Sequence, residues 1–215
     1  MALNVQGIKN MSILNSDKDI RIYTFANRPT ASLMNGGIIK ISDIGPAGSY
    51  WISNGTRWQP LGGSCLIAIS QVASSVTGTA SETVLASATI PSGLMSANGQ
   101  LEVFMLWSHT NAATARNLRS RFGTDPLAGT IYYNPSISTT NTTQSFMIIK
   151  NNNATNSQYG FPNSTGSGYA TSTGTLITSS WNTATTNHVL AFNGALVDTS
   201  QTITLEGYSI TYVEG

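Results

Sequence analysis

The side chains able to do acid–base or metal chemistry are few and widely spaced in this sequence. His109 and His188 are the only histidines, 79 positions apart, and neither belongs to an H-x-x-x-H or C-x-x-C pattern. Zinc sites draw their ligands from such spacings. The sequence therefore predicts no metal site, and we interpret both histidines as surface or strand-end residues.

Nucleophiles and paired carboxylates give no better support for catalysis. Cys65 is the one cysteine, without a histidine near it in sequence, and we interpret it as a small buried apolar residue. A glycosidase needs two carboxylates facing one sugar. No recognisable pair occurs in the sequence after residue 64, although the fold could bring two distant carboxylates together. We expect no catalytic residue and no cofactor. The acidic residues concerned are Glu82, Glu102, Asp125, Asp198, Glu206 and Glu214.

Three arginines form the only basic cluster, at Arg116, Arg119 and Arg121. Positions 119 and 121 point the same way in a strand, so they suit an anion or a sialic acid. Pairing with Glu102 or Asp125 on neighbouring strands explains the same residues without a ligand, and we prefer that interpretation.

The stretch YWISNGTRWQPLGGS, residues 50–64, has the form of an aromatic hairpin. Asn54-Gly55 suits a two-residue type I′ turn, and that register places Trp51 directly opposite Trp58. An aromatic cross-strand pair stabilises a hairpin by about 0.2–1 kcal/mol. We favour this structural role over an exposed platform for sugar rings.

The whole chain has the composition of a strand-rich protein. Its 215 residues are 40% apolar and only 9% charged, with a net charge of +1. The surface instead carries neutral polar groups, from 27 serines, 28 threonines and 19 asparagines. Nucleic acid binding needs clustered cations and is not expected. MALNVQGIKN lacks a signal-peptide pattern, and no apolar run has the length of a membrane span.

Period-two alternation predicts strands throughout, whereas helical spacing is scarce. Short strands are expected at 19–25 and 36–42, flanking a loop that contains Pro29. Eight to ten longer strands follow from residue 66, in the pattern of an antiparallel sandwich or jelly roll. The strand segments are 66–73, 82–91, 99–110, 115–123 and then GTIYYN, QSFMIIK, TGTLITSSW, NHVLAFNGAL and TITLEGYSITYV.

Two of these strands carry further information. Segment 99–110 is apolar on both faces, which predicts a central strand or one that also meets another subunit. In the last strand the apolar parity changes between Leu205 and Tyr208, so we expect a β-bulge at Gly207.

Two segments together resemble tailed-bacteriophage fibre and spike proteins. Residues 28–63 carry R-P-T-A, D-x-G and W-x-S-x-G-T-x-W in that order, and residues 77–123 carry E-T-x-L, I-P-x-G-L-M, N-G-x-L-x-V and R-F-G. Thr124 departs from the second glycine expected after Gly123. The resemblance covers 83 of the 215 residues, as 36 plus 47.

The resemblance implies an all-β, trimeric virion protein without enzymatic activity. Residues 1–27 would attach to capsid or tail proteins, 28–63 would form a hairpin module with a hinge at Gly62-Gly63, and 64–215 would form a jelly-roll-like head that touches the host. A capsid decoration protein, a carbohydrate-binding module and a glycan-cleaving spike are the alternatives.

Receptor contact would fall in the longest irregular stretches, 124–144 and 151–175. Aromatic rings there suit stacking on a host surface glycan and asparagine suits its hydroxyl groups, although the same side chains also suit packing the loops down. The candidate residues are Tyr132, Tyr133, Asn134, Tyr159, Phe161 and Tyr169.

Overall fold

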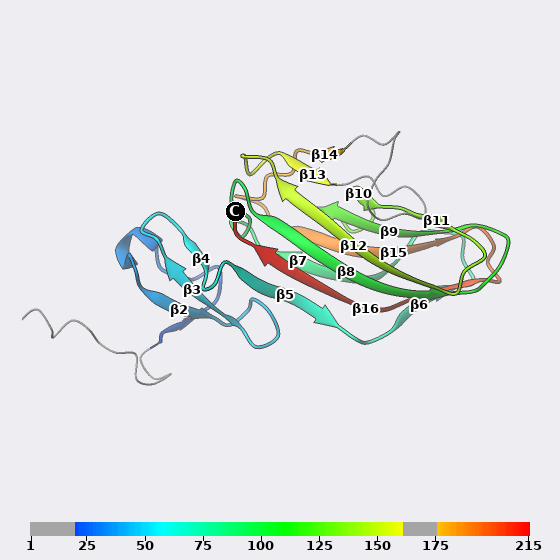
Figure 1. The fold of residues 1–215 in the computed structure, drawn as a ribbon, viewed down its shortest axis with the longest axis horizontal. Coiled ribbons are helices and arrows are strands. Elements are labelled where there is room, and N and C mark those ends of the chain that lie inside the picture. The colour runs from blue at the N-terminus through cyan, green and yellow to red at the C-terminus, as the bar shows by residue number, and fades with distance from the viewer. Residues whose placement is uncertain (1–19, 161–175) are drawn as a thin grey trace, which may run out of the picture.

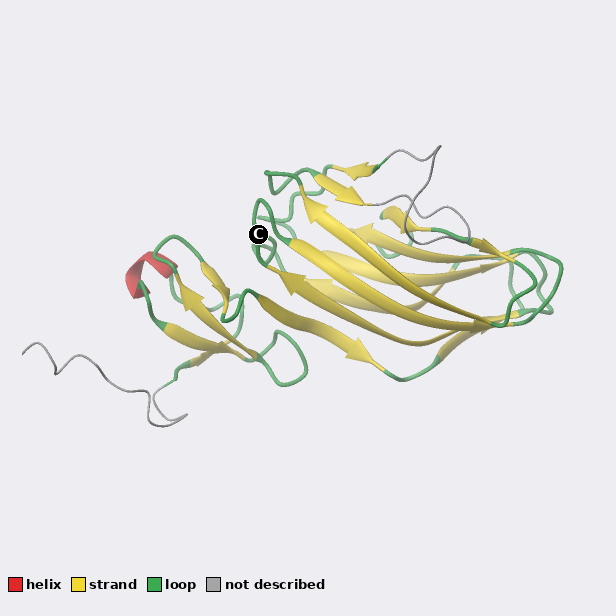
Figure 2. Cartoon of the chain, in the orientation of Figure 1, coloured by secondary structure: helices red, strands yellow, loops and turns green. Residues whose placement is uncertain are grey.

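A computed structural model describes residues 20–160 and 176–215 and contains two β units in line (Figure 1). The smaller unit holds one sheet in the order β1-β2-β3-β4, with β1 and β2 parallel. A short 3₁₀ turn, η2, is the helical element of this part of the chain (Figure 2). The elements of the smaller unit are β1 (Ile22–Tyr23), η2 (Ala31–Met34), β2 (Ile38–Ile41), β3 (Ser49–Ser53) and β4 (Trp58–Pro60).

The hairpin register expected at Asn54-Gly55 is wrong. Ser53 pairs with Trp58, and Trp51 pairs with Pro60, so residues 54–57 form a four-residue loop. The Asn54 side-chain oxygen accepts hydrogen bonds from the backbone N–H groups of residue 56 (3.0 Å) and Arg57 (2.9 Å). This side-chain turn competes with the two-residue backbone turn, and the two tryptophans share a face diagonally rather than directly opposite.

Both tryptophans nevertheless have the structural role that we favoured. Trp51 is buried with its ring edge toward Phe25, at 5.6 Å between centroids. Trp58 is also buried, and its indole N–H donates to the Pro29 carbonyl at 2.6 Å. The indole faces form the core of the small unit, so a sugar platform on them is ruled out.

The larger unit is an antiparallel β-sandwich. Its seven-stranded sheet has the order β14-β13-β12-β8-β16-β5, with β6 also on β16, and its five-stranded sheet has the order β10-β9-β15-β7, with β11 on β9. The bounds are β5 (Ser64–Ser70), β6 (Ser74–Thr77), β7 (Thr83–Ile90), β8 (Gln100–His109), β9 (Arg116–Gly123), β10 (Thr130–Tyr133), β11 (Ser136–Ile137), β12 (Thr142–Asn151), β13 (Gln158–Gly160), β14 (Ile177–Ser179), β15 (His188–Leu196) and β16 (Thr202–Val213).

The strand order is that of a jelly roll, as predicted. When the main strands β5, β7, β8, β9, β10, β12, β15 and β16 are numbered one to eight, the larger sheet reads 6-3-8-1 and the smaller sheet 5-4-7-2. The first and last strands are therefore neighbours, and most connections cross between the sheets. This closure brings chemistry-bearing residues from distant parts of the sequence to the two ends of the sandwich.

The central position of β8 is confirmed, because β12 and β16 pair with its two edges. One of its faces is fully buried against the second sheet, through Leu101, Val103, Met105 and Trp107. The bulge predicted near Gly207 is also confirmed: Leu205 pairs with Trp107 and Gly207 with Leu106, which leaves Glu206 as the extra residue.

Candidate functional site

The paired tyrosines predicted to contact a receptor are buried, which is a correction. Tyr132 and Tyr133 have almost no exposed surface, and their hydroxyl groups hydrogen-bond to Ser179 (2.6 Å) and Ser145 on the opposite sheet. The register of β10 shifts between Ile131 and Tyr133. This bulge turns both neighbouring rings inward, where strand alternation would leave one outside. Burial raises the pKa of Tyr132 to about 12.

The remaining candidates do not converge into one site in the described chain. Asn134 is exposed, and its side-chain oxygen accepts a 3.0 Å hydrogen bond from Arg119. Tyr159 is half-buried in β13, on the other sheet. Phe161 and Tyr169 lie outside the described residues. The structure therefore does not assemble the aromatic platform proposed from the sequence.

The arginine pair on β9 is bound by a carboxylate, but from a different residue than those expected. Arg119 and Arg121 both bind Glu82, with Arg121 donating through Nε (2.6 Å) and Nη2 (2.8 Å). Neither Glu102 nor Asp125 forms these ion pairs. Asn193 donates a further 2.7 Å hydrogen bond to Glu82. The cluster covers the outer face of the smaller sheet instead of gripping an anion.

The electrostatics of Glu82 follow from these contacts. Burial alone raises the pKa of its carboxyl group, but hydrogen bonds from Arg121, Asn193 and Arg119 outweigh burial and hold the pKa at about 2. Charge-assisted hydrogen bonds of this kind favour the ionised form. Glu82 therefore stays ionised at any physiological pH and is unsuited to donate a proton.

Arg116 and His109 organise the loops at the far end of the sandwich. Arg116 is fully buried and donates to the Ser138 carbonyl (2.8 Å), the Gln201 side chain (3.2 Å) and His109 Nδ1 (3.1 Å). It also reaches the carbonyls of residues 114 and 140. One guanidinium thus connects three loops, because its five N–H donors point in fixed directions and reach several acceptors at once.

Both histidines lie at strand ends, as expected, but neither is on the surface. His109 ends β8 and His188 begins β15, and both are buried. Burial, followed by the charge of Arg116, lowers the pKa of His109. Burial also lowers the pKa of His188, whose ring stacks on Phe122 at 5.2 Å. No cluster of three metal-ligating side chains occurs among residues 20–160 and 176–215.

The far end itself offers a largely neutral, hydrogen-bonding surface, with Asp198 as a partly exposed carboxylate. Four connections meet there, at 78–82, 110–115, 138–141 and 197–201, and we call them the distal loops. They lie at the opposite end of the sandwich from the small unit (Figure 1). Their exposed residues are mostly threonine, serine, alanine and asparagine, with Val197 as an exposed apolar side chain. Such a surface suits hydroxyl-rich ligands rather than charged ones.

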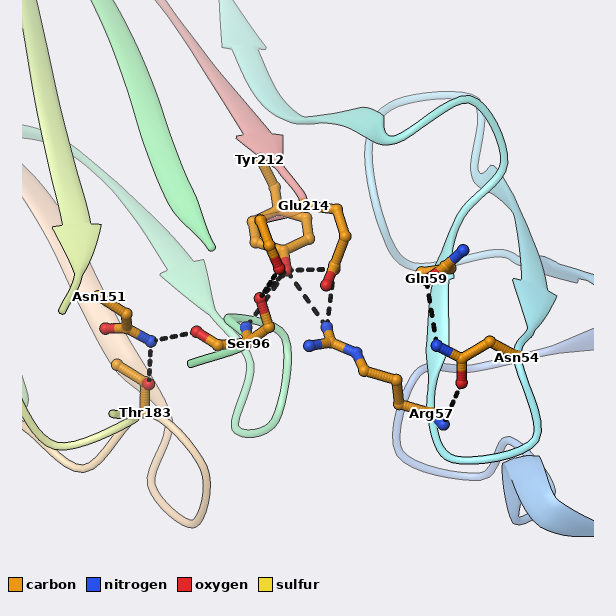
Figure 3. Close-up of polar contacts among 9 residues, drawn as sticks. Asn54, Arg57, Gln59, Ser96, Asn151, Thr183, Tyr212 and Glu214 are labelled. Carbon is orange, nitrogen blue, oxygen red and sulfur yellow. Dashed lines mark hydrogen bonds and ion pairs between the residues drawn. The ribbon is translucent and has the colours of Figure 1, made fainter. Parts of the chain in front are cut away.

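At the near end, a hydrogen-bond network joins the small unit to the sandwich (Figure 3). Arg57 donates to Glu214 at 2.7 Å and to the Tyr212 hydroxyl at 3.3 Å, and Tyr212 donates to Glu214 at 2.6 Å. The Ser96 N–H then donates to Tyr212 at 3.2 Å. We call these contacts the Arg57 bridge.

The Arg57 bridge changes how the Gly62-Gly63 linker is interpreted. Both glycines have positive φ, at 93° and 82°, which allows the tight connection between β4 and β5. The Glu214 N–H donates to the Gly63 carbonyl at 2.7 Å, so the expected hinge is braced at its centre. Sequence offered no signal for this contact, because Arg57 and Glu214 are 157 positions apart.

Comparisons with known proteins add little to this geometry. No protein-family model matches the chain, and no curated protein matches it. Among solved structures, one of the infectious bursal disease virus Gx strain is 12% identical with a TM-score of 0.21. The crystal structure of the infectious bursal disease virus VP2 subviral particle is 14% identical with a TM-score of 0.22.

Each of these matches covers 70% of this chain and 40% of the other chain. This chain therefore spans well under half the length of the viral chains that it matches. Both matches are virus structures, and similarity at this level carries no argument about mechanism.

No helix in the described part of the chain is long and apolar enough to cross a membrane.

Proposed function

We propose that this protein is a non-enzymatic structural component of a bacteriophage virion, a tail or head fibre. In this proposal, residues 1–27 bind capsid or tail proteins, three copies assemble into a homotrimer, and the distal loops contact a glycan on the host surface. The observation that carries the proposal is that the two ends of the molecule differ: a braced small unit lies at one end and a loop-rich, largely neutral surface at the other.

The resemblance at residues 28–63 and 77–123 supports the assignment to phage fibres. The distal loops replace the buried Tyr132 and Tyr133 as the receptor-contacting candidates. A capsid decoration protein without a receptor role is the second candidate. It is favoured by the burial of those two rings, which removes aromatic faces that would stack on sugars.

A matched pair of exposed alanines tests the attachment role. Ala113 lies in a distal loop, and Ala184 lies between β14 and β15 at the near end of the sandwich. We expect the labelled wild-type protein to adhere to host bacteria and to release no sugar from their surface. Ala113→Glu should reduce adhesion about tenfold or more, because it places an unpaired charge in the contact, whereas Ala184→Glu should leave adhesion unchanged.

Two results would contradict the attachment role. Equal adhesion of both variants would exclude the distal loops, and wild-type protein that does not adhere would favour the decoration protein. Release of sugar fragments by the wild-type protein would instead indicate a glycan-cleaving spike.

A further inference from the structure

The outer face of the larger sheet exposes large apolar side chains at its centre. They come from three strands, β12, β8 and β5, and β16, which lies between β8 and β5, contributes the polar Ser209. The outward side of these strands in Figure 2 has no other element of the described chain over it. We call their exposed side chains the apolar face. It consists of Phe146 (57% exposed), Ile69 (47%), Leu106 (43%), Phe104 (40%) and Leu66 (37%).

Strand register aligns these residues across the sheet. Phe146 pairs with Phe104 across β12 and β8, Phe104 pairs with Ser209, and Ser209 pairs with Ile69, so one row crosses all four strands. Leu66 and Leu106 occupy the rows on either side. Diagonal neighbours on adjacent strands lie about 7–8 Å apart, so Phe146, Phe104 and Leu106 form one apolar group. Ile69 and Leu66 form a second group on β5, and Ser209 of β16 lies between the two.

Three charged side chains lie on this side of the sheet. Lys150 is near one end, on β12, whereas Glu102 lies in the row of Leu66 and Glu206 lies in the β16 bulge beside Leu106. The Glu102 carboxylate accepts a 2.8 Å hydrogen bond from Gln100. Apolar centres with polar rims are the usual anatomy of protein interfaces. The row through Phe146, Phe104, Ser209 and Ile69 is uncharged, so it can form the buried centre of a contact that has Glu102 and Glu206 at its rim.

The size of the patch fits subunit contact. Side chains of this class offer roughly 150–200 Å² each, so the stated exposures leave roughly 400 Å² of apolar surface. That is about half of the roughly 800 Å² that one partner contributes to a standard interface, before the polar rim is added. The largest apolar patch on a typical monomer is about 300–600 Å² and is often functional.

We propose that the apolar face is the contact between copies of this chain, with Phe104 and Phe146 at its centre. This inference rests on the proposed assembly of the protein into an oligomer and names the surface responsible. A partner of opposite charge has nothing to recognise at the centre of the face, whereas each further copy brings the same apolar row, and three copies can turn these rows toward a common axis.

The test is the molar mass of the full chain by analytical ultracentrifugation over a range of concentrations. The double variant Phe104→Thr/Phe146→Thr removes both rings but keeps strand-forming residues at outward positions. We expect it to raise the concentration at which the oligomer dissociates by about 100-fold or more, since each aromatic anchor contributes about tenfold or more. Leu33→Thr, at an exposed position on η2, is the control and should keep the wild-type mass.

A second variant keeps the test decisive if the first does not fold. Gln144 is exposed and pairs with Leu106, so Gln144→Lys adds one positive charge per copy to the face without touching the core. It should also shift the equilibrium toward monomer, more strongly at low salt.

The outcomes separate this inference from the proposed function. An oligomer that both variants leave intact would overturn the inference, because some other surface then joins the copies, while the fibre assignment would stand. A wild-type protein that is monomeric at every concentration would overturn both.

Discussion

Glu82 is the ion-pair partner whose removal has the most calculable effect. Its pKa of about 2 in the folded protein compares with about 4.3 in an unfolded chain. At 1.36 kcal/mol per pKa unit this corresponds to about 3 kcal/mol. The side chain is 15% exposed and its arginine partners are partly solvated, so screening reduces the figure to about 1–2 kcal/mol. Glu82→Gln should lower the free energy of unfolding by that amount at pH 7.

The pH dependence gives the sharper test. Because the folded pKa is depressed, the stabilisation is fully present above the unfolded pKa of about 4.3 and is lost as pH falls through about 2. The difference between wild type and Glu82→Gln should therefore be similar at pH 7 and pH 5. By linkage, it should fall to about half at pH 3.

Urea unfolding at one fixed protein concentration measures this difference, since association would otherwise change the apparent stability. Glu102→Gln is the control, because Glu102 bonds to Gln100 and forms none of the ion pairs among residues 20–160 and 176–215. It should change stability by less than about 0.5 kcal/mol. A wild-type minus Glu82→Gln difference that stays constant from pH 7 to pH 3 would refute the reasoning.

Two further substitutions test packing and the join between the units. Gly160→Ala places a Cβ atom 2.0 Å from the Tyr132 ring, so we expect the free energy of unfolding, measured by thermal unfolding, to fall by about 1–3 kcal/mol. A variant as stable as the wild type would show that β13 is not held against that ring. Arg57→Ala removes the contacts to Glu214 and Tyr212, and proteolysis at residues 61–63 should become several times faster. An unchanged cleavage rate would mean that the Arg57 bridge does not restrain the linker.

The fold could be predicted largely from local alternation. Most strands after residue 66 were located because apolar and polar residues alternate over eight or more positions, as in β8. The bulge at Gly207 was visible for the same reason, since a parity change needs an extra residue. Short strands such as β6 and β13, of four and three residues, gave too little periodicity to be recognised separately.

The candidate site was predicted less well, because its contacts depend on distant partners. Tyr132 and Tyr133 look like exposed loop aromatics until the bulge in β10 turns both inward. Glu82 lies 37 and 39 positions from its two arginines, so nothing local distinguished it from Glu102 or Asp125. The predicted hairpin register at Asn54-Gly55 was wrong for a different reason, because hydrogen bonds to the Asn54 side chain replaced the expected backbone turn.

Segment 99–110 carries apolar residues on both faces of the strand, and sequence and structure together account for the two faces. Sequence alone predicted that this strand is central or meets another subunit, and the structure places Phe104 and Leu106 outward while the opposite side chains form the core. The fold of a single chain does not require apolar residues at these outward positions. The proposed contact between copies of the protein would account for them.

Multi-angle light scattering of the purified chain tests the proposed trimer, because a fibre of the proposed kind exists only as an assembly. A trimer should have a molar mass of three chains at micromolar concentration. A mass of one chain, unchanged as the concentration rises, would contradict it.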